Sequence, residues 1–231
     1  MKSLMKPVVL VDFDGVVVRG KSHSNFVQQR VNQYLVDHVK IPKQHVREVN
    51  AELYNGWGHT WYGLKSMGWK ENIANFNKHV YSDLPDHKDE LTLNDDEKKE
   101  WDQFVGAVHQ MDYDVQMFSN SPLLWMTTCM GLDPNDQLFD LHNEINALKC
   151  DRYLKPNRDV YHYIMSKYKK RPIFFIDDKL KNFEHVMDHP KWINMWMTEE
   201  QMRPHIRRNL WNVGDFDDCI QIINNHLWPA K

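Results

Sequence analysis

The sequence predicts an α/β protein with a parallel β-sheet core and an all-helical segment inserted after the first strand. Two observations lead to this fold class. Short unbroken apolar runs alternate with helical patterns, as in a parallel sheet whose strands are buried on both faces. Residues 21–108, by contrast, contain helical patterns and no convincing strand pattern. We therefore expect a core of residues 1–20 and 109–231 and a helical domain of residues 21–108.

The expected strands are short runs rich in β-branched, aromatic or other apolar residues, bounded by polar residues or turn formers. They are VVLVDF (8–13), DVQMFSN (114–120), PIFFIDD (172–178) and, as a fourth strand, WINMWM (192–197).

The expected helices begin and end at residues with known capping preferences. Asn94 precedes an amphipathic run and is a suitable N-cap. Ser121 and Pro122 provide an N-cap and a first-turn proline for a helix that stops near Gly131. Lys155-Pro156 leads into the helical pattern of residues 157–168, which places Lys155 near a helix N-terminus.

Composition excludes several classes of protein. A formal net charge of −3 is too small to indicate bulk attraction to nucleic acid or to an anionic membrane. Cys129, Cys150 and Cys219 are scattered and form no CxxC pair, which favours a reducing compartment over a disulfide framework or a cysteine zinc site. No apolar run approaches the length of a membrane span. We expect a cytoplasmic protein with neither a membrane nor a nucleic acid as partner, and the sequence leaves its oligomeric state open.

Polar side chains follow three of the expected strands at their carboxyl ends. They are Asp12, Asp14, Ser119, Asp177 and Asp178. In an open parallel sheet the binding crevice lies outside these ends, so residues far apart in sequence converge there. Carboxylates at the end of a buried strand are costly to desolvate without a partner, which predicts a cation at this place.

Four motifs in this order resemble those of the haloacid dehalogenase superfamily, whose members are mostly magnesium-dependent phosphatases. They are DFDGV (12–16), FSN (118–120), LKP (154–156) and IDDKLKN (176–182). The resemblance covers residues 7–20 and about 112–228, and within the superfamily the sequence looks most like the pyrimidine 5′-nucleotidase type. It implies a Rossmann-like catalytic core and a small helical cap domain.

The resemblance also implies a role for each acidic residue. Asp12 would be the nucleophile that forms an aspartyl-phosphate, and Asp14 would act first as a general acid and then as a general base. The dehalogenase branch lacks this second acid, so Asp14 favours phosphoryl transfer. Asp12, the main-chain carbonyl of Asp14, and Asp177 or Asp178 would bind Mg²⁺, which prefers oxygen ligands.

The remaining motif residues would bind the phosphoryl group or support the site. Ser119 and Asn120 would contact phosphoryl oxygens, and the charge of Lys155 would offset the nucleophile and the developing negative charge. Asn182 would hold an acid or the lysine in place from outside the metal's own ligand set.

The expected cap contains a segment dense in aromatic residues and glycine. Trp57, His59, Trp61 and Tyr62 are candidates for stacking on a base or closing over a sugar. They could instead form the cap's own hydrophobic core, and the high average burial of Trp and Tyr favours that second interpretation.

The function predicted from the sequence is Mg²⁺-dependent hydrolysis of a small phosphorylated metabolite through an aspartyl-phosphate, with a nucleoside 5′-monophosphate as the substrate. One alternative is a sugar-phosphate or other small-metabolite phosphatase, or a phosphomutase. A catalytically silent binding module and a phosphatase acting on nucleic-acid ends are further alternatives. The complete acidic set argues against the silent module, and the lack of a basic stripe argues against the nucleic-acid substrate.

Overall fold

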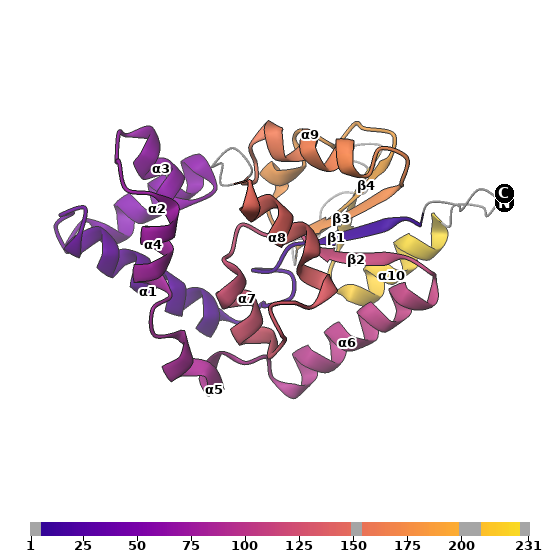
Figure 1. Ribbon diagram of the computed structural model, residues 1–231, viewed down its shortest axis with the longest axis horizontal. Helices are drawn as coiled ribbons and strands as arrows, with labels where there is room; N and C mark the ends of the chain where they lie inside the picture. Colours follow the sequence, from indigo (N-terminus) through magenta and orange to yellow (C-terminus); the bar gives the residue numbers. More distant parts are fainter. Residues whose placement is uncertain (1–5, 149–153, 199–208, 227–231) are drawn as a thin grey trace. The chain divides into compact units, whose positions relative to one another are not determined.

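The computed structural model describes residues 6–148, 154–198 and 209–226, and the chain forms two compact units (Figure 1). The sheet unit comprises the described residues of Met1–Arg19 and Leu93–Lys231. The helical unit is Gly20–Thr92, inserted after the first strand. Among the described residues, no helix is both long and apolar enough to cross a membrane.

The second boundary between the units falls at residue 92, earlier than the expected 108. The helix α6 (Asp95–Gln110) belongs to the sheet unit, because its apolar face packs against α10 (Phe216–Asn225). The rings of Phe104 and Phe216 stack with their centroids 4.5 Å apart. Helical periodicity predicts the helix but does not say which domain its apolar face covers. The capping box at Asn94 confirms the expected start of this helix.

Within the described residues, the sheet contains five parallel strands in the order β2-β1-β3-β4-β5. The strands are β1 (Val8–Val11), β2 (Asp114–Met117), β3 (Ile173–Asp177), β4 (Trp192–Met197) and β5 (Leu210–Val213). All four expected strands are present, and β5 was not expected. Its four residues are buried only at the two ends, so it lacks the continuous apolar run of a central strand.

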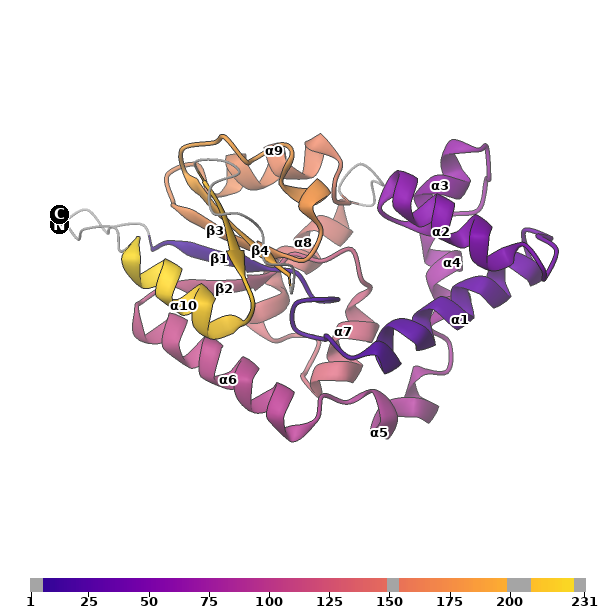
Figure 2. The ribbon, with the colours of Figure 1, turned by 180° about the vertical axis from the view of Figure 1, so that it is seen from behind.

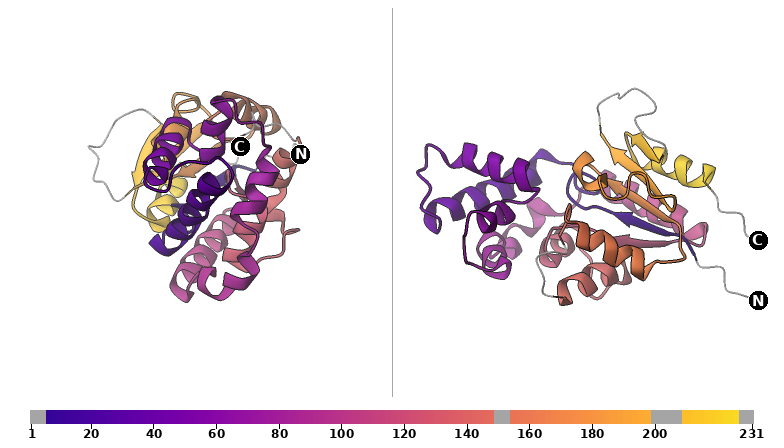
Figure 3. Two further views of the ribbon diagram at one scale, coloured as in Figure 1. Left: turned by 90° about the vertical axis from the view of Figure 1, so that its left-hand side faces the viewer. Right: turned by 90° about the horizontal axis from the view of Figure 1, so that it is seen from above.

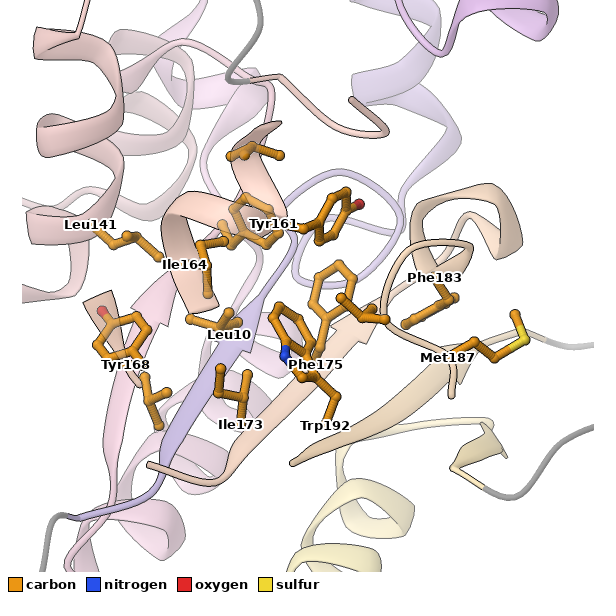
Figure 4. Packing of buried hydrophobic residues seen from close by; sticks show 14 of the residues in the cluster. Leu10, Leu141, Tyr161, Ile164, Tyr168, Ile173, Phe175, Phe183, Met187 and Trp192 are labelled. Atoms are coloured by element: carbon orange, nitrogen blue, oxygen red, sulfur yellow. The ribbon is translucent and has the colours of Figure 1, made fainter. Parts of the chain in front are cut away.

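Helices cover both faces of the sheet. The helices α8 (Asp140–Ala147) and α9 (Arg158–Lys167) lie on one face, and α6 and α10 lie side by side on the other (Figures 1 and 2). Seen from above, the orange helix α9 and the yellow helix α10 lie on opposite sides of the strands (Figure 3). The core under α8 and α9 is rich in aromatic rings, and Phe175 of β3 contacts both Tyr161 and Trp192 edge-on (Figure 4).

Two helix starts in the sheet unit differ from expectation. The N-cap of α7 (Leu123–Met130) is Pro122, so Ser121 lies outside that helix, whereas Gly131 ends it as expected, at a φ of 65°. Helix α9 is capped by the Asn157 side chain and begins at Arg158, which leaves Pro156 before the helix. The described part of the unit also contains the short 3₁₀ turns η2 (Gln137–Phe139) and η4 (Leu180–Phe183). Cys129 and Cys219 are buried free thiols, and Cys150 lies outside the described residues.

The helical unit has no strand among its described residues, as the sequence predicts. Its helices are α1 (Lys21–Asp37), α2 (Val46–Trp57), α3 (Thr60–Ser66), α4 (Ile73–Val80), η1 (Leu84–His87) and α5 (Lys88–Leu91). Thr60 donates to Asn50, and Asn50 donates to Asn32, so hydrogen bonds join α3, α2 and α1. This satisfies buried polar groups inside a small apolar core.

Candidate active site

The carboxyl ends of β1, β2 and β3 meet at one edge of the sheet. The Asp12 N–H donates to the Ile176 carbonyl at 2.9 Å, and the Phe118 N–H donates to the Val11 carbonyl at 2.8 Å. These main-chain bonds extend the two parallel pairings by one residue past the end of β1. The motif residues that follow the three strands are therefore brought together, as the topology rule predicts.

Three carboxylates form a cluster at this edge. Asp12, Asp177 and Asp178 each offer an oxygen, and the three oxygens lie within 4.8 Å of one another. The Lys155 ammonium lies 3.0 Å from Asp12 Oδ1 and 2.6 Å from Asp177 Oδ2, with only 1% of its side chain exposed. This buried cation compensates part of the negative charge, as a buried carboxylate pair requires.

Burial and neighbouring charges shift the pKa of each of these groups in opposite directions. Burial disfavours the charged form of Lys155, but the carboxylates of Asp12 and Asp177 outweigh it and raise the lysine's pKa above its ordinary value. Burial raises the pKa of Asp177, while the neighbouring Lys155 ammonium lowers it. The site therefore holds an excess of acidic groups over cations in a poorly hydrated place, which is an electrostatic arrangement suited to a divalent ion.

Asp177 and Asp178 differ in how fully the protein satisfies them. Asp177 Oδ1 accepts from the Lys179 N–H and from Asn182 Nδ2, and Asp177 Oδ2 accepts from Lys155 and from Asn182 Nδ2. Asp178 Oδ2 pairs with the Lys179 ammonium at 2.6 Å, but Asp178 Oδ1 is buried and has no hydrogen-bond partner within the described part of the chain. An unpaired buried carboxylate oxygen is costly, so it fits a metal ligand better than a structural group.

The turn after β1 brings the chain close to Asp178. Gly15 has a φ of +84°, and a Cβ built on it would lie 2.4 Å from the Asp178 carboxyl carbon. Any larger residue would displace this carboxylate. Because oxygen ligands suit Mg²⁺, Asp12 and Asp178 could hold such an ion. Asp177 and Asn182 would not bind the ion themselves but would hold the neighbouring groups in place through hydrogen bonds.

Asp14 lies outside the carboxylate cluster and reaches solvent. One of its oxygens accepts from the indole N–H of Trp125 at 2.9 Å, and the other accepts from the Ser121 hydroxyl. Partial desolvation raises the pKa of Asp14 above its ordinary value, and these two hydrogen bonds oppose that rise. A carboxyl group that is held in place, open to solvent and shifted upward has the properties of a proton donor and acceptor.

The structure assigns the Asn120 side chain to a different task from the expected phosphate contact. Its Oδ1 accepts from the Lys155 N–H at 2.8 Å, and its Nδ2 donates to the Lys155 carbonyl at 2.7 Å. The amide is thereby committed to the main chain of the lysine, because a carboxamide matches the donor and acceptor of one residue. Ser119 accepts from the Ser121 N–H at 3.2 Å through its Oγ, which keeps its own hydroxyl proton for a ligand.

His142 of α8 contacts the loop that contains Ser119. It is 4% exposed, bonds to the main chain of Ser119 and lies 2.7 Å from Asn146 through Nε2. Burial lowers the pKa of His142 to about 4, so the ring is neutral. With Nε2 accepting from the Asn146 amide, the proton lies on Nδ1.

The four aromatic candidates of the helical unit have different surroundings. Trp61 is 2% exposed, and its indole N–H donates to the Glu71 carbonyl, so it belongs to the core and offers no face to a base. The His59 ring caps α3 by accepting from the Trp61 N–H, and burial lowers its pKa to about 4. Tyr62 is half-buried and packs edge-on against Trp61. Trp57, at 50% exposure, presents a ring to solvent.

Sequence reasoning missed Ser121, Trp125 and His142. The sequence offers Ser121 as a helix cap and Trp125 as an apolar helix residue, and both descriptions are locally plausible. Only the packing of α7 against the turn after β1 reveals that both bind Asp14. The sequence did predict the role of Asn182. The expectation that it holds an acid in place is confirmed by its two hydrogen bonds to Asp177.

The fold is similar to solved structures of the haloacid dehalogenase (HAD) superfamily. A HAD phosphatase from Thermococcus onnurineus matches with a TM-score of 0.58 and 16% identity, over 95% of this chain and 98% of that chain. A haloacid dehalogenase-like hydrolase from Burkholderia xenovorans matches with a TM-score of 0.53 and 12% identity, over 97% of this chain and 99% of that chain. A scan against protein-family models and a search of curated proteins gave no match. At these identities the likeness establishes the HAD fold, and the narrower resemblance to pyrimidine 5′-nucleotidases stays a prediction.

Proposed function

We propose that this protein is a Mg²⁺-dependent phosphomonoester hydrolase that acts through an aspartyl-phosphate on Asp12. The observation that carries the proposal is a second carboxyl group, that of Asp14. It lies two residues after the nucleophile and is held outside the carboxylate cluster. Asp12 supplies a nucleophile, and Asp14 supplies the proton that a poor leaving group requires. The HAD-fold phosphatase from Thermococcus onnurineus supports the same reaction class by analogy.

In the first step an oxygen of Asp12 bonds to phosphorus and the bond from phosphorus to the ester oxygen breaks. The electron pair stays on the leaving oxygen, which takes the proton of Asp14. In the second step Asp14 removes a proton from water, the water oxygen bonds to phosphorus, and the bond to Asp12 breaks. Both carboxyl groups return to their starting states.

Positively charged and hydrogen-bond donating groups of the site stabilise the negative charge that develops on the phosphoryl group. The Lys155 ammonium, 3.0 Å from Asp12 Oδ1, reduces repulsion between the nucleophile and a phosphate dianion. The Ser119 hydroxyl is available to donate to a phosphoryl oxygen. Mg²⁺, held by Asp12 and Asp178, would supply further neutralisation of that charge.

The narrower part of the proposal is that the substrate is a nucleoside 5′-monophosphate. Its support is the exposed ring of Trp57 on α2, with Tyr54 one helical turn earlier and 44% exposed. Aromatic rings on a helix surface are suited to stacking on a base. Because such a ring could also close over a sugar, the substrate panel below has to separate nucleotides from sugar phosphates.

Phosphate release from a panel of nucleotides, sugar phosphates and p-nitrophenyl phosphate tests the proposal. We expect release with Mg²⁺, none after chelation, and recovery when Mg²⁺ is added back. Release that survives exhaustive chelation would exclude the metal-dependent mechanism. Absence of release from every phosphomonoester would favour the silent binding module instead.

A further inference from the structure

We propose that Trp125 and Ser121 are positioning residues for Asp14. They keep its carboxyl away from the carboxylate cluster and available to the leaving group. This inference rests on the proposed function and identifies residues that none of the four motifs gives this role. It starts from the pair of hydrogen bonds that hold the two oxygens of Asp14.

The main chain at Asp14 is fixed before its side chain is considered. The N–H groups of Val16, Val17 and Val18 all donate to the Phe13 carbonyl, and the Gly15 N–H donates to the Val18 carbonyl at 2.8 Å. This tight turn leaves the Asp14 side chain with its χ torsions as the main freedom. Where the carboxyl points is therefore decided by the groups that it meets.

The two groups that it meets differ in rigidity and in chemistry. Trp125 is 0% exposed, and its indole is held by the core, so its N–H is a fixed donor. An indole N–H can only donate, so the oxygen facing it can only accept. The Ser121 hydroxyl can donate or accept, and it rotates. The oxygen facing Ser121 is therefore the one that can carry and deliver the proton.

A carboxyl without these partners would have a competing place to go. The carboxylate cluster of Asp12, Asp177 and Asp178 would attract a divalent ion, and Asp14 lies close enough to both Asp12 and Asp178 for their charges to act on it. A free Asp14 carboxylate could turn toward that ion and become a ligand. The bond to Trp125 opposes this rotation, because the rotation would break a hydrogen bond from a donor that is fixed in the core.

The test compares two substrates that differ in their need for a proton. The leaving group of an alkyl phosphate is an alkoxide, which requires an acid to protonate it. The leaving group of p-nitrophenyl phosphate is nitrophenolate, which departs without an acid. The value of kcat/KM reports steps up to the first irreversible one, so it excludes the hydrolysis of the aspartyl-phosphate. We expect Trp125→Phe and Ser121→Ala each to lower kcat/KM for the alkyl phosphate by about 10–100-fold, within the range of general acid catalysis. The value for p-nitrophenyl phosphate should change less than about threefold, since that substrate does not use the acid.

Two controls separate positioning from folding. Trp192→Phe makes the same change at another fully buried tryptophan, whose indole N–H has no hydrogen-bond partner among the described residues. It should leave the ratio between the two substrates unchanged. Ser121→Thr keeps a hydroxyl and should recover most of the alkyl phosphate activity that Ser121→Ala loses.

The outcomes distinguish this inference from the proposed function. If the wild-type protein hydrolyses neither substrate, the proposed function fails. If it hydrolyses both and the two variants lose activity equally on both substrates, the positioning role is wrong. Should Trp125→Phe fold poorly, Ser121→Ala decides alone, and an unchanged substrate ratio in that variant overturns the inference.

Discussion

Removing the buried ammonium of Lys155 should destabilise the sheet unit far more than removing an exposed one. The ammonium lies 2.6 Å from Asp177 and 3.0 Å from Asp12, with 1% of the lysine side chain exposed. Lys155→Met would leave two buried carboxylates without their cation. Breaking a buried ion pair in this way typically costs about 3–5 kcal/mol, which corresponds to a fall in Tm of roughly 6–20 °C for a domain of this size.

The experiment is urea and thermal unfolding followed by circular dichroism, in EDTA so that no divalent ion replaces the lost charge. Lys98→Met is the matched control, because the pair of Lys98 with Asp102 is 2.9 Å long but both side chains are more than half exposed. Its cost should be within about 0.5 kcal/mol. Adding Asp177→Asn to Lys155→Met should recover part of the loss, since it removes one uncompensated charge. Equal costs for the two lysine variants would refute the electrostatic account of the site.

Three further predictions concern the metal, the cap and pH. Asp178→Asn should weaken Mg²⁺ binding by more than about tenfold in titration calorimetry, because it removes the charge of the carboxylate whose Oδ1 has no hydrogen-bond partner among the described residues, and unchanged affinity would contradict the assignment. Trp57→Ala should raise KM for a nucleotide by roughly 10–100-fold and leave p-nitrophenyl phosphate and Tm unchanged, whereas Trp61→Ala should lower Tm and affect both substrates. Burial in the folded protein lowers the pKa of His142 to about 4, so the unfolded chain binds an extra proton as the pH falls below about 6.5, and the stability present above that pH is lost. Relative to His142→Gln, the wild-type protein should lose up to about 3 kcal/mol between pH 7 and pH 4, and parallel pH curves would rule this out.

Much of the sheet unit could be predicted from the sequence because its central strands are continuous apolar runs. The strand β3 is buried at all five residues, and β4 at all six, so neither pattern is compatible with a solvent-facing element. The same topology places Asp12 beside Asp177 without any knowledge of side-chain contacts. The strand β5 could not be predicted, because Trp211 and Asn212 are exposed and the run of buried residues is broken.

The contacts of the site were less predictable than its composition. A serine before a proline signals a helix cap locally, and the sequence gives no sign that Ser121 faces an acid 107 positions away. Asn120 likewise matches a phosphate-binding motif, yet its amide finds both a donor and an acceptor on Lys155. Such pairings depend on how loops from different strands pack, and one sequence does not encode them as a pattern.

The central claim is that Asp12 becomes phosphorylated during turnover. The most direct measurement is acid quenching of the Asp14→Asn variant during reaction with p-nitrophenyl phosphate and Mg²⁺, followed by borohydride reduction and peptide mass spectrometry. This variant lacks the base for the second step, so the aspartyl-phosphate should accumulate. Borohydride reduces an aspartyl-phosphate to homoserine, and we expect homoserine at position 12 and nowhere else in the chain. Release of nitrophenolate with an unmodified aspartate at position 12, or with the modification at another acid, would contradict the proposed mechanism.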